Sequence, residues 1–227
     1  MNQATYHAIE QYMLDTMNDT AHDPMHIYRV LYSALDIAST EPQANADVVI
    51  AAALLHDVGR PKQAENPELD HAAEGAPMAK SFLMQIGWPE SMANHVADCV
   101  RTHRYRRGDA PSTLEARIIF DADKLDACGV LGISRTLAYG AQVTEPLYIL
   151  DAHKQIITEG GGAEISSFFQ EYNWKLRGIY GKMLTVRGKA LAQRRRDAAY
   201  QFYDALEREI NECHSYDAAL MSHLSKP

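Results

Sequence analysis

The sequence contains few cysteines: Cys99, Cys128 and Cys213 are far apart in the chain and odd in number. Such a set does not indicate the disulfide framework that holds small secreted domains together. A chain of 227 residues can also bury a sizeable core without disulfides or a structural metal. We therefore expect a globular protein of one or two domains that is stabilised by ordinary hydrophobic packing.

The sequence also contains fewer positively charged than negatively charged residues. The chain has 22 lysines and arginines against 30 aspartates and glutamates, which gives a formal net charge of −8. General binding to nucleic acid or to anionic membranes requires a basic surface, so this balance argues against both kinds of partner. It leaves room for a local basic pocket that binds a nucleotide.

The sequence has no long apolar segment. Its longest uninterrupted apolar run, residues 48–55, is eight residues long, whereas a membrane-spanning helix needs about 20. The first residues, MNQATYHAIEQY, lack the basic segment and the following apolar core of a secretory signal peptide. We expect a cytoplasmic protein without a membrane partner.

Alternating strand patterns are scarce, and helical periodicity recurs along most of the chain. The fold class predicted from this pattern is all-α. Helices are expected at residues 4–17, 24–39, 46–57, from 71, 89–103, from 113, 164–181 and 185–213. The helix at 46–57 is apolar on most sides and should be central. We predict a single domain over residues 1–227, with a core at about 20–140 and a C-terminal helical extension at about 164–213.

Capping residues and helix breakers set the expected helix ends. A helix stop is expected at Gly59 and Pro61, and a kink or restart at Gly75 and Pro77. The expected N-caps are Asp23 before Pro24, Asn45, Asp70, and Ser112 in a capping box with Glu115.

A histidine and an aspartate, His56 and Asp57, stand side by side at the end of the apolar helix 46–57. Their burial is costly unless a neighbouring residue or a metal ion pairs with them. Two other predicted helices carry His26 and the aspartates of DADKLD, residues 121–126. Imidazole and carboxylate groups together suit a divalent ion. The wide spacing means that the fold must assemble such a site.

Helical phase selects one aspartate of the DADKLD segment. Asp123 shares a face with Ile119 and Phe120, so it is expected to point toward the core. Asp121 lies nearer Arg117 and can form an i, i+4 pair with it at the rim. We therefore predict that Asp123 is the fourth ligand.

The ordered set His26, His56, Asp57 and Asp123 resembles the HD-domain metal-dependent phosphohydrolase superfamily. The similarity runs over about residues 20–140, in HDPMHIYRV, AAALLHDVGR, HAAEG, VRTHR and EARIIFDADKLDACGVLGISR, and MLTVRGKALAQRR near 183–196 is also similar. These segments look like the small stand-alone bacterial HD hydrolases. The resemblance implies an all-α HD fold, a divalent ion (manganese, magnesium, cobalt or iron) on these four residues, and hydrolysis of phosphate esters or anhydrides, often in nucleotides.

The resemblance also implies roles for the HAAEG and VRTHR segments. In the family, these segments often complete or border the metal site, here through His71 and His103. The two histidines either bind a second ion, or move protons and hold a phosphate around a single ion. Some relatives carry acidic residues just after the His-Asp pair, where this chain has Val58-Gly59-Arg60. We therefore predict that Glu74, supported by His71, assists proton transfer, with Asp57 as the alternative proton acceptor.

Other polar residues near the ligands are candidates for binding the substrate. Arg60, Lys62 and Lys124 can neutralise phosphate oxygens, and their alternative is to be solvated surface charges. Asp126, one helical turn beyond Asp123, is expected to orient a ligand or to contact a ribose hydroxyl.

These features favour a metal-dependent phosphohydrolase acting on a small phosphorylated metabolite, foremost a nucleotide. The resemblance points first to cleavage of a nucleoside triphosphate into monophosphate and pyrophosphate, and then to a nucleotidase. One alternative is an HD-type di-iron oxygenase, because six ligands can be counted: His26, His56, Asp57, His71, His103 and Asp123. The other alternative is a metal-binding module without turnover. No residue pattern identifies a nucleobase pocket.

Overall fold

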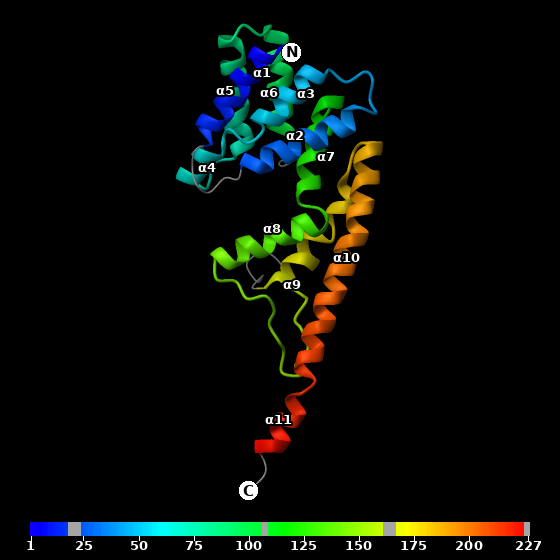
Figure 1. Cartoon of the computed structure of the whole chain (residues 1–227). Helices are drawn as coiled ribbons and strands as arrows, with labels where there is room; N and C mark the ends of the chain where they lie inside the picture. Colours follow the sequence, from blue (N-terminus) through cyan, green and yellow to red (C-terminus); the bar gives the residue numbers. More distant parts are fainter. Residues whose placement is uncertain (18–23, 106–108, 161–166, 225–227) are drawn as a thin grey trace. The chain divides into compact units, whose positions relative to one another are not determined.

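The computed structural model describes residues 1–17, 24–105, 109–160 and 167–224 (Figure 1). The regular elements within these ranges are helices, apart from one antiparallel bridge between Leu150 and Ile156. The all-α prediction is therefore confirmed. Within the same ranges, no helix has the length and apolar character needed to cross a membrane. Asp23, the expected cap of the second helix, lies outside the described residues.

The chain forms two compact units. The first comprises residues 1–126 together with 183–190, and the second comprises 127–182 together with 191–227. The expected core at 20–140 therefore extends past the end of the first unit at Asp126. In addition, a short segment from the expected C-terminal extension belongs to the first unit.

Seven helices and the start of an eighth build the described part of the first unit. They are α1 (Gln3–Thr16), α2 (Pro24–Ala38), α3 (Ala46–Leu55), α4 (Arg60–Glu65), α5 (His71–Gln85), α6 (Glu90–Thr102), α7 (Leu114–Asp126) and the first residues of α10 (Val186–His214). The expected helix at 46–57 is α3, and it contacts α1, α2, α6 and α7. Seven of its ten residues are buried and apolar, so its predicted central position is confirmed.

Two helix boundaries differ from the expected ones. Gly59 and Pro61 begin the short helix α4, with Pro61 in its first turn, where the missing N–H of proline has no cost. Helix α5 runs without a break through Gly75 and Pro77. Gly75 lies against the backbone of Gly59, so its missing side chain allows a close approach of α5 to the turn before α4 rather than a restart.

The expected capping box at Ser112 is replaced by a different pair of contacts. Thr113 Oγ1 accepts a hydrogen bond from Ala116 N at 3.2 Å, one residue later than expected. Glu115 accepts a hydrogen bond from Asn45 N at 2.7 Å. The glutamate therefore connects α7 to the start of α3 instead of capping its own helix.

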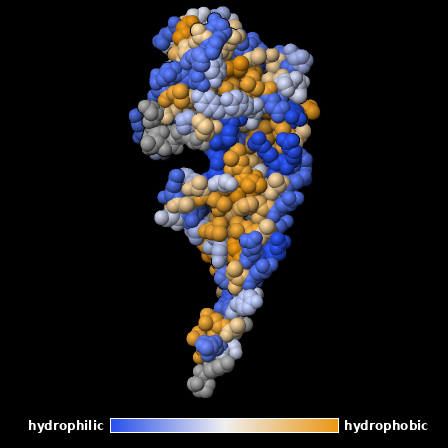
Figure 2. Space-filling model, in the orientation of Figure 1, coloured by the Kyte–Doolittle hydropathy of each residue, from blue (hydrophilic) through white to orange (hydrophobic). Residues whose placement is uncertain are grey.

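The second unit has its own apolar core. It contains α8 (Gly129–Gln142), α9 (Phe168–Glu171), the π-helix η2 (Tyr172–Leu176), the 3₁₀ helix η3 (Ile179–Lys182), the rest of α10 and α11 (Asp217–Leu224). Its buried cluster consists of Ile133, Phe168, Phe169, Tyr172, Leu176, Ala199, Tyr203 and Ile210. Figure 2 shows apolar surface over α8 and α9. Val130, Leu131 and Tyr139 of α8 are exposed, as is Val143 directly after the helix. The helix expected at about 164–181 is thus three short helical segments, and α11 was not expected.

Candidate metal centre

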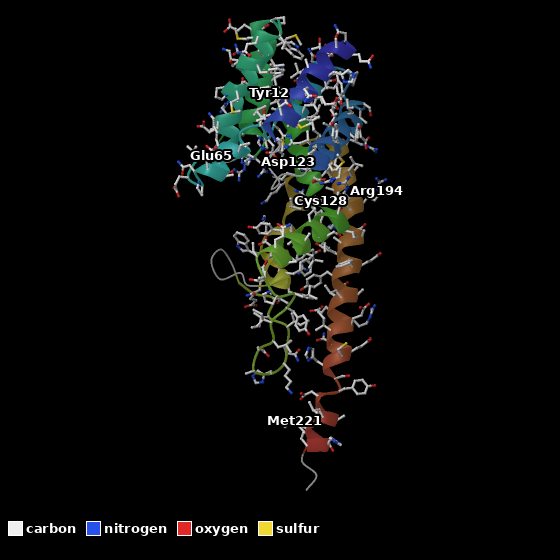
Figure 3. All side chains as sticks on the ribbon, turned by 60° about the vertical axis from the view of Figure 1, so that its left-hand side comes forward. Tyr12, Glu65, Asp123, Cys128, Arg194 and Met221 are labelled. Carbon is white, nitrogen blue, oxygen red and sulfur yellow. The ribbon has the colours of Figure 1, made fainter. Side chains whose placement is uncertain are left out.

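Six potential metal ligands converge inside the first unit. They come from α2, the turn after α3, the first residue of α5, the residue after α6, and α7: His26, His56, Asp57, His71, His103 and Asp123. Figure 3 labels Asp123, which lies in the last part of α7 among the helices of this unit. Residues far apart in the sequence are thus brought together by the helix packing, as the wide spacing required.

Asp57 stands at the centre of this cluster. Its Oδ2 atom lies 3.5 Å from Nε2 of both His26 and His56. Its Oδ1 atom lies 3.1 Å from His71 Nε2 and 3.7 Å from His103 Nε2. The side chain is only 1% exposed. One buried carboxylate therefore faces two histidine pairs, one with each oxygen.

The cluster divides into two groups of three ligands. His26, His56 and Asp123 form one group, and Asp57, His71 and His103 form the other. Within each group the ligand atoms lie within 4.8 Å of one another. Because the Oδ2 atom of Asp57 also borders the first group, the carboxylate can join the two.

All four histidines direct the same ring nitrogen into the cluster. Each Nδ1 donates a hydrogen bond outward: to Asp126 Oδ2 from His26 (2.7 Å), to Ala53 O from His56 (2.8 Å), to Gln63 Oε1 from His71 (2.6 Å) and to Val100 O from His103 (2.6 Å). A neutral ring with its proton on Nδ1 presents an unprotonated Nε2 lone pair. This is the second-layer arrangement that orients metal-binding histidines.

Two buried atoms lack a hydrogen-bond partner among the described residues of the cluster, Asp57 Oδ1 and His71 Nε2. Burial of such atoms without a partner is costly, and a shared cation removes that cost. The donor set of imidazole nitrogens and carboxylate oxygens is the one used by divalent transition metals. The residues therefore fit a divalent ion in each group.

The charges of the cluster are strongly coupled. Burial lowers the pKa of His56, of His71 and, to about 3, of His103, so these rings are neutral near pH 7. Burial also opposes the charge on Asp57, but the surrounding histidines and Arg60 hold the pKa of its carboxyl well below the usual range. Neutral imidazoles around an ionised carboxylate are in the protonation states that bind a metal.

His26 behaves differently from the other three histidines. Burial disfavours its charge, but hydrogen bonds with Asp126 and Asp57 outweigh that effect and raise its pKa to about 9. Without a metal, a proton on this ring serves as the positive charge between the carboxylates. A metal that binds His26 Nε2 must therefore displace that proton.

The structure places Asp123 in the cluster, with its Oδ1 atom 3.5 Å from His26 Nε2. The prediction for Asp121 was wrong, because this residue is fully buried and is not paired with Arg117 at a rim. Asp121 accepts hydrogen bonds from Leu184 N (2.8 Å), Thr185 N (2.7 Å) and Thr185 Oγ1 (2.6 Å). This role could not be predicted from the helical phase of α7, because the segment before α10 that covers Asp121 is distant in the sequence.

The predicted substrate-binding cations all lie beside carboxylates. Arg60 Nε contacts Asp57 Oδ2 at 2.5 Å, and Lys124 Nζ lies 3.2 Å from Asp123 Oδ2. Lys62 Nζ contacts Glu74 Oε2 at 2.9 Å, and the Glu74 side chain is one-third exposed. Glu74 is not among the six clustered residues. Its predicted part in proton transfer stays a prediction.

Asp126 and His103 lie where a role in orienting or holding a metal is expected. Asp126 accepts hydrogen bonds from His26 Nδ1 and from Arg29 Nε, each at 2.7 Å, and its predicted role stays a prediction. His103, predicted to hold a phosphate or to border a second ion, is buried inside the second group.

Three supporting residues were not predicted from the sequence: Arg29, Gln63 and Arg104. Gln63 holds the His71 ring, and Arg104 Nη1 lies 3.3 Å from His71 Nδ1 and from Asp70 Oδ1. Arg29 stands three residues after His26, and Arg104 directly follows His103. Both arginines stand close to a predicted ligand in the sequence, and this proximity could have identified them. No sequence feature pointed to Gln63.

Residues 25–128 match the family model of the HD domain. This part of the chain is an HD domain. It contains all six clustered residues, and it ends two residues beyond α7. The family resemblance read from the sequence motifs is therefore confirmed.

The similarity to known proteins extends beyond the HD domain to most of the chain. YpgQ of Bacillus subtilis is 27% identical over 199 residues, which are 86% of this chain and 87% of YpgQ. The crystal structure of YpgQ in complex with ADP has a TM-score of 0.71 at 24% identity, and covers 91% of this chain and 95% of that one.

A predicted HD superfamily hydrolase from an uncultured Thermotogales bacterium is 26% identical, with a TM-score of 0.64. It covers 92% of this chain and 99% of its own. An HD superfamily hydrolase of Bacillus thuringiensis is 25% identical, with a TM-score of 0.70, and covers 92% of this chain and 98% of its own. The solved proteins that resemble the chain therefore include HD superfamily hydrolases of nearly the same extent.

Proposed function

We propose that this protein is a metal-dependent phosphohydrolase that acts on nucleotides. The observation that carries the proposal is the central position of Asp57, whose two oxygens face two pairs of histidine Nε2 atoms inside a buried cluster. Such a set of nitrogen and oxygen donors suits one divalent ion at His26, His56, Asp57 and Asp123, and a second at Asp57, His71 and His103. A divalent ion in such a site polarises a phosphoryl oxygen and lowers the pKa of a bound water.

The chain's own residues supply the remaining functions. Asp126, Gln63 and the carbonyl groups of α3 and α6 hold the four rings so that each Nε2 faces inward. The cations Arg60 and Lys124 stand at the edge of the cluster, where they can offset the charge of phosphate oxygens. Lys62 holds the Glu74 carboxylate on the first turn of α5, one turn beyond His71. We assign to that carboxylate the transfer of the proton from the attacking water.

The assignment of a nucleotide substrate is supported by YpgQ, which has been crystallised with ADP. It is also compatible with the acidic chain, because a nucleotide needs only local cations, and Arg60 and Lys124 border the cluster. We propose cleavage of a nucleoside triphosphate to monophosphate and pyrophosphate as the leading reaction, with nucleotidase activity as the next.

The test is an activity panel in which nucleoside tri-, di- and monophosphates and sugar phosphates are each incubated with manganese, magnesium, cobalt or iron. Phosphate and pyrophosphate are measured separately, so that the two nucleotide reactions are distinguished. Hydrolysis that requires a metal and is lost in Asp57→Asn supports the proposal. The absence of hydrolysis with every metal and every phosphate compound would contradict it.

The six-ligand set also suits a di-iron oxygenase, and this is the second candidate. Both functions use the same residues, so the ligand count does not separate them. Iron content of the purified protein and oxygen consumption with organic substrates distinguish the oxygenase, because a phosphohydrolase consumes no oxygen.

A further inference from the structure

Tyr105 has a backbone conformation that is unusual for its residue type. It follows His103 by two residues, at the end of α6, and its φ angle is +48°. Its N–H donates to Thr102 O at 3.0 Å, which closes the turn after the helix. Helices often end in a residue with positive φ, but that residue is usually glycine or asparagine, since a side chain is strained there. The chain therefore keeps a large aromatic ring where glycine would be more stable.

The ring of Tyr105 packs against Phe120, an aromatic residue of the helix that carries the metal ligand Asp123. The side chain is half-exposed, and its ring forms a T-shaped contact with the Phe120 ring at a centroid distance of 6.1 Å and an angle of 68°. Phe120 is buried on α7, one turn before Asp123. Lys124 Nζ stands 5.0 Å from the centre of the Phe120 ring and 3.2 Å from Asp123 Oδ2. The buried ring of Phe120 therefore contacts both the half-exposed tyrosine and the lysine that borders the metal ligand.

This arrangement matches a ligand that has an anionic end and a flat aromatic end. Arg60 and Lys124 can face phosphate oxygens at the cluster, while a half-exposed tyrosine that packs against Phe120 offers a ring surface for stacking. A nucleotide is the class of molecule with both ends. Stacking of a base on an aromatic side chain does not depend on hydrogen bonds that read the base, which agrees with the lack of a base-reading pattern in the sequence.

We propose that Tyr105 is a substrate-binding residue whose ring stacks on the base of the nucleotide while the phosphates reach the metal centre. This inference rests on the proposed function and names how the site recognises its substrate. It also accounts for the strained backbone, because strain of this kind persists where the residue has a functional role.

The experiment uses the full chain and three variants. Tyr105→Gly removes the ring and relieves the positive φ, and Tyr105→Phe keeps the ring. Tyr32→Ala removes another exposed tyrosine, on α2, as the matched control. Binding of ADP in the presence of manganese is measured by titration calorimetry, thermal unfolding is recorded, and kcat/KM is determined for a nucleoside triphosphate and for inorganic tripolyphosphate, which has no base.

We expect Tyr105→Gly to raise the Kd for ADP by about tenfold, which is the loss of one aromatic stacking contact. Its kcat/KM for the nucleoside triphosphate should fall by about the same factor, with that for tripolyphosphate unchanged. Its melting temperature should be no lower than that of the wild type, whereas a merely structural tyrosine would lower it. Tyr105→Phe and Tyr32→Ala should bind ADP as the wild type does.

Wild-type ADP affinity in Tyr105→Gly overturns the inference, and the phosphohydrolase activity stands if the panel supports it. Absence of ADP binding by the wild type also overturns the inference. Conversely, a protein that hydrolyses no phosphate compound but binds ADP in a Tyr105-dependent manner supports the inference and overturns the proposed reaction. The failures of the two proposals are therefore distinguishable.

Discussion

Asp57 is the residue on which the two ligand groups depend, because one of its oxygens borders each group. Replacement with asparagine removes the charge and leaves one oxygen in place. We expect Asp57→Asn to lose metal from both groups, whereas His103→Gln loses metal only from the group with His71. Elemental analysis after dialysis measures this directly, with the exposed Asp98→Asn as the control. Equal metal content in Asp57→Asn and wild type would show that Asp57 is not a ligand.

The buried histidines give the metal-free protein a characteristic dependence of stability on pH. The pKa of His103 is lowered by burial to about 3, so below its unfolded value of about 6.5 the unfolded state binds a proton that the folded state does not. The free energy of unfolding then falls as the pH drops from about 6.5 toward 3, by about 1.4 kcal/mol per pH unit for one such group.

The other histidines also change how the free energy of unfolding depends on pH, some in acid and one in base. His56 and His71, whose pKa values are also lowered, add to the loss in acid. His26 acts in the opposite direction, because its raised pKa gives stability that is fully present below about 6.5 and lost as the pH rises through about 9. Urea unfolding in EDTA at several pH values should therefore show maximal stability near neutral pH. His103→Gln should reduce the acid slope by about one proton, and an unchanged slope would refute the neutral state of this ring.

A substitution of Glu74 tests whether this carboxylate takes part in proton transfer. Glu74→Gln keeps the shape of the side chain and removes the charge, so metal content should be unchanged while turnover falls by about 10²–10⁴-fold, the usual contribution of general acid–base catalysis. Glu65→Gln, at the end of α4, is the matched control. Activity of Glu74→Gln within about threefold of wild type would leave Asp57 as the better proton acceptor.

At the scale of helices, α7 carries two aspartates with separate functions. Asp121 binds the backbone that leads into α10, and Asp123 faces the histidines. We expect Asp121→Asn to lower the free energy of unfolding by about 1–3 kcal/mol, because a buried charged acceptor of three hydrogen bonds is lost. Its metal content should stay at the wild-type level, while Asp123→Asn should lose metal. Urea unfolding and elemental analysis on both variants test this division, which the opposite ranking would disprove.

The same helix shows how far the sequence determines the site. The periodicity of α3 and α7 pointed to His56, Asp57 and Asp123 as inward-facing polar residues, whereas His26 was assigned through its place in the ordered set that resembles the HD family. The hydrogen bonds that hold the rings were not predictable, because Gln63 and Asp126 meet their histidines only after the helices pack. The burial of Asp121 depends on a segment more than sixty residues away, which local phase cannot include.

At the scale of the whole molecule, the HD domain lies almost entirely within the first compact unit, which also includes residues 1–24 and 183–190. Arg187 of this segment donates to both carboxylate oxygens of Asp36 on α2, at 3.0 and 3.1 Å. Composition and periodicity gave no boundary at Asp126, because only two residues separate the end of α7 from the start of α8, and neither is polar. The return of a short segment to the first unit is a tertiary feature that periodicity does not reveal.

The measurement that tests the central claim most directly is reconstitution of activity after removal of metal. The protein is stripped with a chelator, manganese is added in steps, and hydrolysis of a nucleoside triphosphate is followed together with bound metal. We predict no turnover in the stripped protein, recovery in proportion to the metal bound, and no recovery in Asp57→Asn. Full hydrolysis by the stripped protein, or recovery in Asp57→Asn equal to that of the wild type, would contradict the account.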